Sequence, residues 1–347
     1  MKKNSLVILF VSISFVPGIF LGSCESWGAA SAEEYFAIGM AYYDIGKYDE
    51  AEKWLNRAKA KDKTKNASEY NLGRIAFEAK RYDEAVKHFE AVLKRDPNNV
   101  LALKAAAYTH IKNNDIVKAG EFYKRLLAIV PESYDDGYNY ALVLFAMKKF
   151  DETEQVLKNY EFALLDNSEV LLLYARAQKE QGKPEAVDSY ASWLVNNSDP
   201  KVRYEYAQLL EGQQMYARAL EEFKAVYTAI SSGSVDPSRP EVRFNIARLT
   251  LTADAQNTEG ATELKEAVNE GYNDIDEIEK LLSDDRISAA NKNEIRAIVT
   301  EKRREQEEAK AKAKAEAEAK AEAEKAEAEK AAQDSETAGN QEIEAGK

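Results

Sequence analysis

Apolar and polar positions alternate along the chain at helical spacing, most clearly over residues 66–99. Apolar or small residues three and four positions apart share one side of a helix, so this stretch predicts two short amphipathic helices joined by a tight turn at 80–82. Pro97 ends the unit, because proline has no amide hydrogen for a helix interior and keeps Asp96 out of the helical region. The residues that define the two faces are Leu72, Gly73, Ala76, Ala85, Phe89 and Val92.

The same arrangement recurs at steps of 34 residues. Since one hairpin cannot bury its own apolar face, the recurrence predicts a stack of hairpins, in which small residues allow close helix approach and large ones fill the gaps. The small position of the first helix is held by Gly39, Gly73, Ala107, Ala141 and Ala175, then less regularly by Ala207 and Ala247. The small position of the second helix is held by Ala51, Ala85, Ala119, Thr153, Val187 and Ala219. The large position is held by Leu55, Phe89, Tyr123, Leu157, Ala191 and Phe223, and the turn position by Tyr48, Tyr82, Ile116, Phe150, Pro184 and Tyr216.

This pattern resembles the tetratricopeptide repeat (TPR) family, whose period is also 34 residues. The resemblance covers Ala32–Val268 and implies an all-α, right-handed solenoid of about six to seven helical hairpins. The motif residues are Tyr35, Ile38, Gly39, Tyr42, Gly46, Tyr48, Ala51 and Ala58 in the first repeat, and Leu72, Gly73, Tyr82, Ala85, Phe89 and Pro97 in the second. We expect repeats at 32–65, 66–99, 100–133, 134–167, 168–199, 200–233 and 240–270.

The later repeats depart from the motif. Thr153 and Val187 crowd a position that is small elsewhere, and no proline closes the fourth unit near Leu165. The segment Asp254–Gly260 is interpreted as an insertion between the helices of the last hairpin. The Gly, Ser and Pro residues of Ser231–Pro240 predict a loop between repeats six and seven, and this loop is the expected hinge.

Three segments follow the repeats. Residues 271–300 predict capping helices at Ile275–Leu282 and Ile287–Ile298, which cover the open face of the last repeat. Residues 301–333 consist almost only of Ala, Glu, Lys and Arg, which favour a long, charged, solvated helical spacer. A coiled-coil seam there would have only alanine to bury. Residues 334–347 predict a disordered tail.

Residues 1–23 have the layout of a secretory signal peptide, with a charged start followed by an apolar run. The tripeptide Leu21-Gly22-Ser23 before Cys24 resembles a bacterial lipobox. The resemblance implies that Cys24 is lipidated, that residues 24–31 form a tether, and that the protein is anchored in the bacterial envelope. Ordinary cleavage at Ala30-Ser31-Ala32, which would give a soluble periplasmic or secreted protein, is the alternative. Both readings place the protein outside the cytoplasm.

Composition narrows the function classes. The formal net charge of −13 argues against a nucleic-acid partner, because phosphate binding needs clustered Lys and Arg. The two histidines, His88 and His110, fall at repeat positions, and no Cys/His cluster has metal-ligand spacing. Paired acids such as Asp135-Asp136 are most simply helix caps. We therefore expect no catalytic residue, no metal and no cofactor, and interpret the chain as a non-enzyme.

The family resemblance also implies that the first helix of each hairpin lines a concave groove. Residues between the packing positions face this groove, and in repeats one to four they are mostly aromatic or aliphatic, which is typical of binding surfaces. The family's clamp for acidic C-terminal peptides needs Lys and Asn where this chain has Phe36 and Met40, so that ligand is not expected. The candidate partner-binding residues are Phe36, Met40, Tyr43, Tyr70, Arg74, Phe77, Lys104, Tyr108, Ile111, Tyr138, Leu142, Phe145 and Arg176.

These features predict a protein–protein interaction scaffold of the bacterial cell envelope that binds an apolar or aromatic segment of a protein partner in its groove. Membrane contact would come from the lipid anchor, and self-association into a homo-oligomer stays open. Two alternatives come from other classes: an accessory ligand-binding subunit of an envelope transporter, with a hydrophobic molecule in the concavity, and a surface-exposed adhesin.

Overall fold

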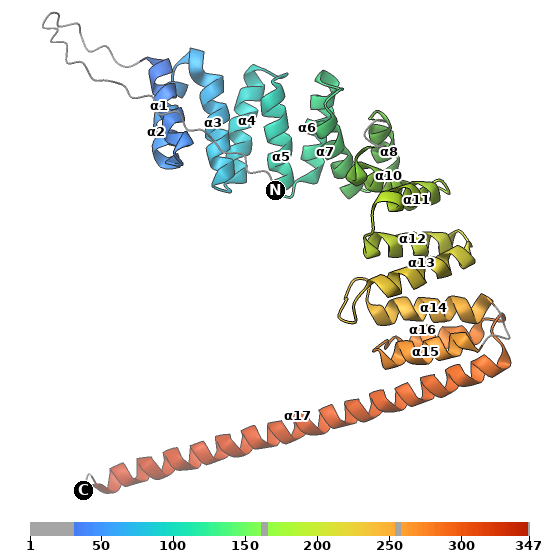
Figure 1. The fold of residues 1–347 in the computed structure, drawn as a ribbon. Coiled ribbons are helices and arrows are strands. Elements are labelled where there is room, and N and C mark those ends of the chain that lie inside the picture. The colour runs from blue at the N-terminus through green and yellow to red at the C-terminus, as the bar shows by residue number, and fades with distance from the viewer. Residues whose placement is uncertain (1–30, 161–165, 254–257, 346–347) are drawn as a thin grey trace, which may run out of the picture. The chain divides into compact units, whose positions relative to one another are not determined.

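The computed structural model describes residues 31–160, 166–253 and 258–345, and these residues are almost entirely helical (Figure 1). They divide into two compact units: unit 1 ends at Pro131 and unit 2 begins at Glu132. Cys24, the signal-peptide prediction and the tether lie outside the described residues, as does Leu165.

Unit 1 contains three helical hairpins. Their helices are α1 (Ala32–Asp44) with α2 (Tyr48–Lys59), α3 (Lys65–Glu78) with α4 (Tyr82–Arg95), and α5 (Val100–Lys112) with α6 (Ile116–Ile129). Side-chain caps explain several helix starts: Ser31 accepts from the backbone N–H of Glu34 in a capping box, and Asn99 accepts from that of Ala102. A short 3₁₀ turn, Asp62–Thr64, precedes α3.

Unit 2 contains four more hairpins among its described residues, followed by a terminal group of helices. The hairpins are α7 (Tyr134–Ala146) with α8 (Phe150–Lys158), α10 (Ser168–Glu180) with α11 (Ala186–Asn196), α12 (Pro200–Gly212) with α13 (Tyr216–Ala229), and α14 (Arg239–Ala253) with α15 (Glu259–Asn269). The terminal group is α16 (Ile275–Lys280), a 3₁₀ turn (Leu281–Ser283) and α17 (Ala289–Ala345). The predicted all-α array of helical hairpins is confirmed.

Small residues lie at the predicted close contacts between paired helices. A Cβ atom on Gly73 would lie 2.6 Å from a ring carbon of Phe89, and one on Gly39 would lie 2.8 Å from Cγ of Leu55. The alanines at the equivalent position in the later repeats, from Ala107 to Ala247, are fully buried. The first two hairpins are therefore each closed by one small and one large residue, 16 positions apart.

The fifth hairpin corrects two predicted packing positions. Val187 and Ala191 were expected at the small and large positions of its second helix, but Ala186 and Tyr190 are the fully buried pair. The reason is a turn that is one residue shorter. Ala186 is the fourth residue after the left-handed turn residue Gly182, whereas in the other turns of this kind the residue at the small position is the fifth after it.

The last hairpin corrects the predicted insertion. Gly260 was interpreted as part of an insertion that began at Asp254, but it lies in the first turn of α15 and is buried. A Cβ atom there would lie 2.7 Å from the backbone nitrogen of Leu251, so Gly260 permits the close contact between α14 and α15. Residues 254–257 lie outside the described part of the chain.

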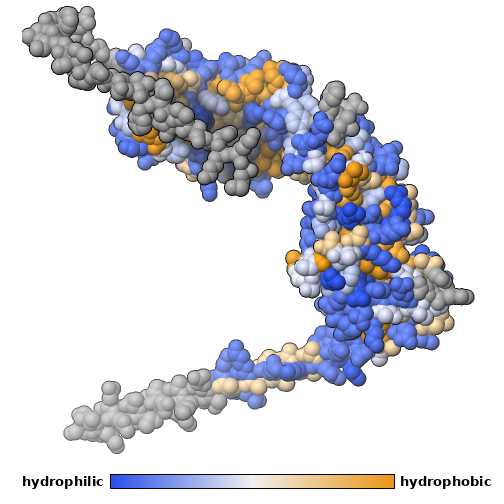
Figure 2. Space-filling view, viewed as in Figure 1, coloured by the Kyte–Doolittle hydropathy of each residue, from blue (hydrophilic) through white to orange (hydrophobic). Residues whose placement is uncertain are grey.

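The C-terminal helix corrects two predicted boundaries. The second capping helix, the spacer and most of the expected disordered tail form one helix, α17, which continues to Ala345. Its first turns bury Ile295 and Val299 in the core of the terminal group, and its surface is exposed from Arg303 to Lys325. Figure 2 shows this exposed part as hydrophilic with weakly hydrophobic residues between. Alanine, glutamate, lysine and glutamine are strong helix formers, and no proline interrupts them.

Turns with a left-handed residue join the helices in six of the described hairpins. The left-handed residues are Gly46, Lys80, Asn114, Lys148, Gly182 and Gln214, with φ between 59° and 72°. In the first two turns the next residue donates back to the last turn of the helix, as Lys47 N–H does to the carbonyl of Tyr42 and Arg81 N–H to that of Ala76. These turns are Schellman motifs, which favour glycine at the left-handed position.

Lys148→Gly should raise the free energy of unfolding by about 0.5–1 kcal/mol. A residue with a side chain costs about 1–2 kcal/mol in the left-handed region, and glycine removes this cost. Glycine also increases the conformational entropy of the unfolded chain, which offsets part of the stabilisation. Gly46→Lys is the reciprocal control and should destabilise, since a Cβ there meets open space and only the backbone conformation changes. Chemical denaturation of the full chain measures both. If both variants changed the free energy of unfolding in the same direction, the left-handed conformation would not be what favours glycine at these turns.

Candidate functional site

The first helices of unit 1 present nine of the candidate residues on one face. Most of these side chains are half-buried, whereas Lys104 and Tyr108 are exposed, Tyr108 to 43%. The nine are Phe36, Met40 and Tyr43 on α1, Tyr70, Arg74 and Phe77 on α3, and Lys104, Tyr108 and Ile111 on α5. Partial exposure leaves these side chains accessible to a partner, and their role in binding stays a prediction.

Ring and cation contacts connect the three helices of this face. The guanidinium carbon of Arg74 lies 4.5 Å from the ring centroid of Tyr43, which joins α3 to α1. The rings of Phe77 and Tyr108 are 5.5 Å apart, which joins α3 to α5, and Nζ of Lys112 lies 5.1 Å from the Tyr108 centroid. Such contacts contribute modestly where they are exposed, but they hold the side chains in place. The face is therefore a pre-organised strip of aromatic and cationic groups.

A small pocket opens in this face between α3 and α5. Its volume is about 100 Å³. The apolar walls come from Phe77, Phe89, Ala105 and Tyr108, and the remaining lining groups are Arg74, Glu78 and Thr109. Ala105 and Thr109 were not among the candidate residues, because the sequence offers no signal that two neighbouring helices leave a gap at that point.

Unit 2 presents the other four candidates in different states. Leu142 is 40% exposed, whereas Tyr138 packs on the core formed by α7, α8 and α10, and the rings of Phe145 and Phe150 are 5.1 Å apart. Arg176 is already engaged: its Nε and one terminal nitrogen donate to the two carboxylate oxygens of Glu205 at 2.9 and 2.8 Å. Leu142 is thus the most accessible of the four, and Arg176 is a weaker candidate than the sequence suggested.

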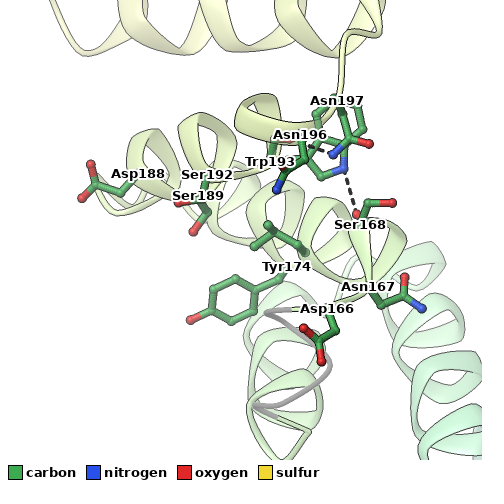
Figure 3. Close-up of a pocket in the computed structure, with 11 residues that line it drawn as sticks. Asp166, Asn167, Ser168, Tyr174, Asp188, Ser189, Ser192, Trp193, Asn196 and Asn197 are labelled. Carbon is green, nitrogen blue, oxygen red and sulfur yellow. Dashed lines mark hydrogen bonds between the residues drawn. The ribbon is translucent and has the colours of Figure 1, made fainter.

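A second cavity lies between α10 and α11 of unit 2, with a volume of about 520 Å³. Figure 3 shows serine, asparagine and aspartate side chains from both helices around it, together with Tyr174 and Trp193. The indole nitrogen of Trp193 donates to the carbonyl of Ser168 at 2.8 Å, and Asn197 donates to the carbonyl of Trp193. The lining carries hydroxyl, amide and carboxylate groups and no cation, so it suits a neutral polar group and disfavours an anion.

A buried carboxylate network joins the fourth and fifth hairpins. Glu154, which is 4% exposed, accepts from Nζ of Lys158 at 2.8 Å, Nζ of Lys183 at 2.5 Å and Nε2 of Gln181 at 3.0 Å. Burial by itself raises the pKa of Glu154, but the hydrogen bonds from these three donors outweigh it and lower the pKa to about 2. Helical spacing predicts only the contact with Lys158, four residues away on the same helix. Gln181 and Lys183 flank a turn 27–29 residues away from Glu154, so their part in the network could not be read from the sequence pattern.

His110, which falls at a repeat position in the sequence, is only 2% exposed in unit 1. Its ring stacks on Phe122 with centroids 5.3 Å apart, and neither ring nitrogen has a hydrogen-bond partner. Burial lowers the pKa of His110, which the nearby carboxylates, above all that of Asp115 with an oxygen 3.7 Å from Nδ1, oppose only in part. Lys118 adds to the lowering.

Acidification from pH 7.5 to 5.5 should destabilise unit 1 through His110. The unfolded chain takes up the proton near pH 6.5 and the folded chain only at lower pH, so stability is full above 6.5 and falls below it, by at most about 1.4 kcal/mol per pH unit. Hydrogen exchange of α5 and α6 in the full chain measures this. In His110→Phe the stability of unit 1 should differ less between pH 7.5 and pH 5.5. An unchanged pH dependence in that variant would show that His110 is not the group responsible.

The described residues contain no group of three or more His, Cys, Asp or Glu side chains placed to hold a metal ion. Within the same residues, no helix has both the length and the apolar character needed to cross a membrane. The pKa of Asp284, which lies in another acid pair, is lowered by hydrogen bonding from the side chain of Arg286.

Comparison with known proteins identifies the repeats. Residues 32–65 and residues 76–138 match family models that are both described as tetratricopeptide repeat. A Treponema pallidum protein described as an uncharacterized lipoprotein is 24% identical over 194 residues, which make up 55% of this chain and 98% of that relative. The ycf37 protein of Guillardia theta is 28% identical over 139 residues, 35% of this chain and 78% of its own.

Two solved structures illustrate the structural likeness. A tetratricopeptide repeat protein from Parabacteroides merdae is 22% identical, with a TM-score of 0.44, and covers 73% of this chain and 97% of its own. A crystal structure of the MamA protein is 16% identical, with a TM-score of 0.43, and covers 47% of this chain and 90% of its own.

Proposed function

We propose that this chain, which carries tetratricopeptide repeats, is a non-catalytic scaffold that binds a segment of a protein partner on the faces of its first helices. The observation that carries the proposal is the strip of unit 1. There Arg74 of α3 contacts Tyr43 of α1, Phe77 of α3 contacts Tyr108 of α5, and apolar surface stays open beside them. Aromatic and arginine side chains of this kind supply most of the binding energy at protein interfaces.

The proposal extends to location. The scaffold is held in the bacterial envelope by lipid at Cys24, with α17 extending from unit 2 toward a further partner. The lipoprotein description of the Treponema pallidum relative and the lipobox-like residues before Cys24 support this. Mass spectrometry of the mature N-terminus decides between a lipidated Cys24 and ordinary cleavage at Ala30-Ser31-Ala32, and Cys24→Ser should release the protein from membranes only in the first case.

The structure permits a sharp test of the binding face. Tyr108→Ser and Leu142→Ser change one exposed apolar candidate in each unit without opening a core. Val117→Ser on α6 and Val195→Ser on α11 are matched controls, because they remove exposed apolar side chains from second helices. Cross-linking and pull-down from intact cells should lose partner protein with the first pair and keep it with the controls. If all four variants recovered as much partner protein as the unchanged chain, the faces of the first helices would not be the binding surface.

The cavities give little support to a subunit that carries a hydrophobic molecule. The apolar pocket of about 100 Å³ is below the roughly 300 Å³ at which small-molecule sites begin. The cavity of about 520 Å³ is large enough, but most residues that line it are serine, asparagine or aspartate, beside Leu171, Tyr174 and Trp193. The adhesin alternative differs in location alone, and protease treatment of intact cells separates it from a periplasmic scaffold.

A further inference from the structure

The pocket between α3 and α5 has the size of one aliphatic side chain. Its volume of about 100 Å³ is far below that of a small-molecule site, so a whole ligand does not fit and a single anchoring residue does. Its walls are fixed: Phe89 is 1% exposed, and the Phe77 ring is held between Tyr82 and Tyr108, with centroids 5.5 Å from each. A pre-formed pocket of this kind binds an anchor at little entropic cost.

Charge changes sign across the three first helices of unit 1. Helix α1 contains three acidic residues and no basic one, α3 contains two of each, and α5 contains two lysines and no acid. The lysines are Lys104 and Lys112, both exposed. At the other end Asp44 is exposed, whereas Glu33 is paired with Lys63 at 2.5 Å. The pocket lies between α3 and α5, and therefore beside the positive end.

We propose that unit 1 selects a protein segment of defined polarity: one aliphatic side chain in the pocket, acidic residues on the α5 side of it, and basic residues on the α1 side. This rests on the proposed function and adds the chemistry of the partner. Lys112, whose Nζ lies over the Tyr108 ring at the edge of the pocket, is the group that the acidic residues contact. Charge complementarity of this kind fixes the orientation and register of the segment more than it adds affinity.

The test uses the full-length chain and three labelled ten-residue peptides. The first has one isoleucine between a two-glutamate end and a two-lysine end, the second has serine in place of isoleucine, and the third has lysine in place of every acid. Fluorescence anisotropy should show the first peptide binding at least tenfold more tightly than the second, as expected for one buried anchor. Equal binding of the first two peptides would overturn the proposal.

Protein variants locate the contact. Ala105→Leu fills the pocket and should bring the isoleucine peptide down to the level of the serine peptide. Lys112→Glu should weaken the first peptide by about fivefold and improve the third, whereas Lys124→Glu on α6 makes the same charge change outside the face and should do neither. Circular dichroism confirms that each variant is folded. If neither Ala105→Leu nor Lys112→Glu changed the affinity for the first peptide, the peptide would bind elsewhere and the proposed pocket contact would be wrong.

A second copy of the chain is the competing occupant, because the sequence Glu342-Ile343-Glu344 also combines one aliphatic residue with acids. Sedimentation of the full chain over a range of concentrations decides this. If the chain self-associates and Ile343→Asp abolishes this, the pocket binds a second copy of the chain. The proposal of an external protein partner would then be wrong. Binding of the peptides together with unchanged partner recovery in Tyr108→Ser would instead retain the pocket chemistry and reject the proposed scaffold function.

Discussion

Glu154→Gln should lower the free energy of unfolding of unit 2 by about 2–3 kcal/mol at pH 7. The lowering of the Glu154 pKa from 4.5 to about 2 means that its surroundings favour the ionised over the neutral form by about 3–4 kcal/mol. Glutamine resembles the neutral form but keeps an oxygen that can accept a hydrogen bond, so its effect should be somewhat smaller. The effect belongs to the junction between the fourth and fifth hairpins, because the donors come from α8 and from the turn after α10.

The pH dependence gives this prediction its control. A carboxyl with a lowered folded pKa stabilises fully above the unfolded pKa, so the contribution of Glu154 should persist above about pH 4.5 and disappear between 4.5 and 2. Hydrogen exchange of α8 and α10 in the full chain measures it locally, which is necessary because repeat arrays do not unfold in one step. Glu152→Gln, an exposed i,i+3 partner of Lys149, should change little. Equal losses in the two variants would contradict the special role of Glu154.

Gly73→Leu is expected to destabilise unit 1 by about 3 kcal/mol. A Cβ atom alone would approach Phe89 to 2.6 Å, and the ring is too enclosed to move aside. Phe89→Ala should also cost about 3–4 kcal/mol, because it leaves a cavity. The double variant Gly73→Leu, Phe89→Ala exchanges the large and the small residue across one contact. Its loss of unfolding free energy should therefore be smaller than the sum of the two single losses, by about 1 kcal/mol or more. Chemical denaturation measures all three, and strict additivity would show that the two residues do not oppose each other.

The periodicity of the sequence was sufficient for the architecture because each hairpin is specified locally. Its small and large positions lie 16 residues apart and its turn residues between them, so the positions of Gly39, Gly73 and the later alanines were predictable one repeat at a time. The fifth hairpin shows the limit. A fixed 34-residue step placed Val187 and Ala191 in the core, and only the spacing from Gly182 reveals that one turn residue is missing.

The residue types of the candidate site could be predicted from the sequence, but not which of its side chains are exposed and which already contact another residue. Position in the repeat identified Tyr108 and Arg176 equally well, yet Tyr108 is exposed and Arg176 is bound to Glu205, 29 residues away. Such pairing depends on which side chains of neighbouring helices meet, and helical periodicity carries no information on that. The same is true of the gap at Ala105, which exists because two helices leave a space that neither sequence segment encodes.

The continuity of α17 has a mechanical consequence. Because one helix runs from the buried Ile295 and Val299 to Ala345 without a joint, its far end keeps a fixed angular phase relative to the terminal core. Each added residue would turn that end by about 100° and advance it by about 1.5 Å. Seven-residue insertions would therefore lengthen the arm at nearly constant orientation, whereas two-residue insertions would leave its length almost unchanged and reverse the direction in which the tip faces.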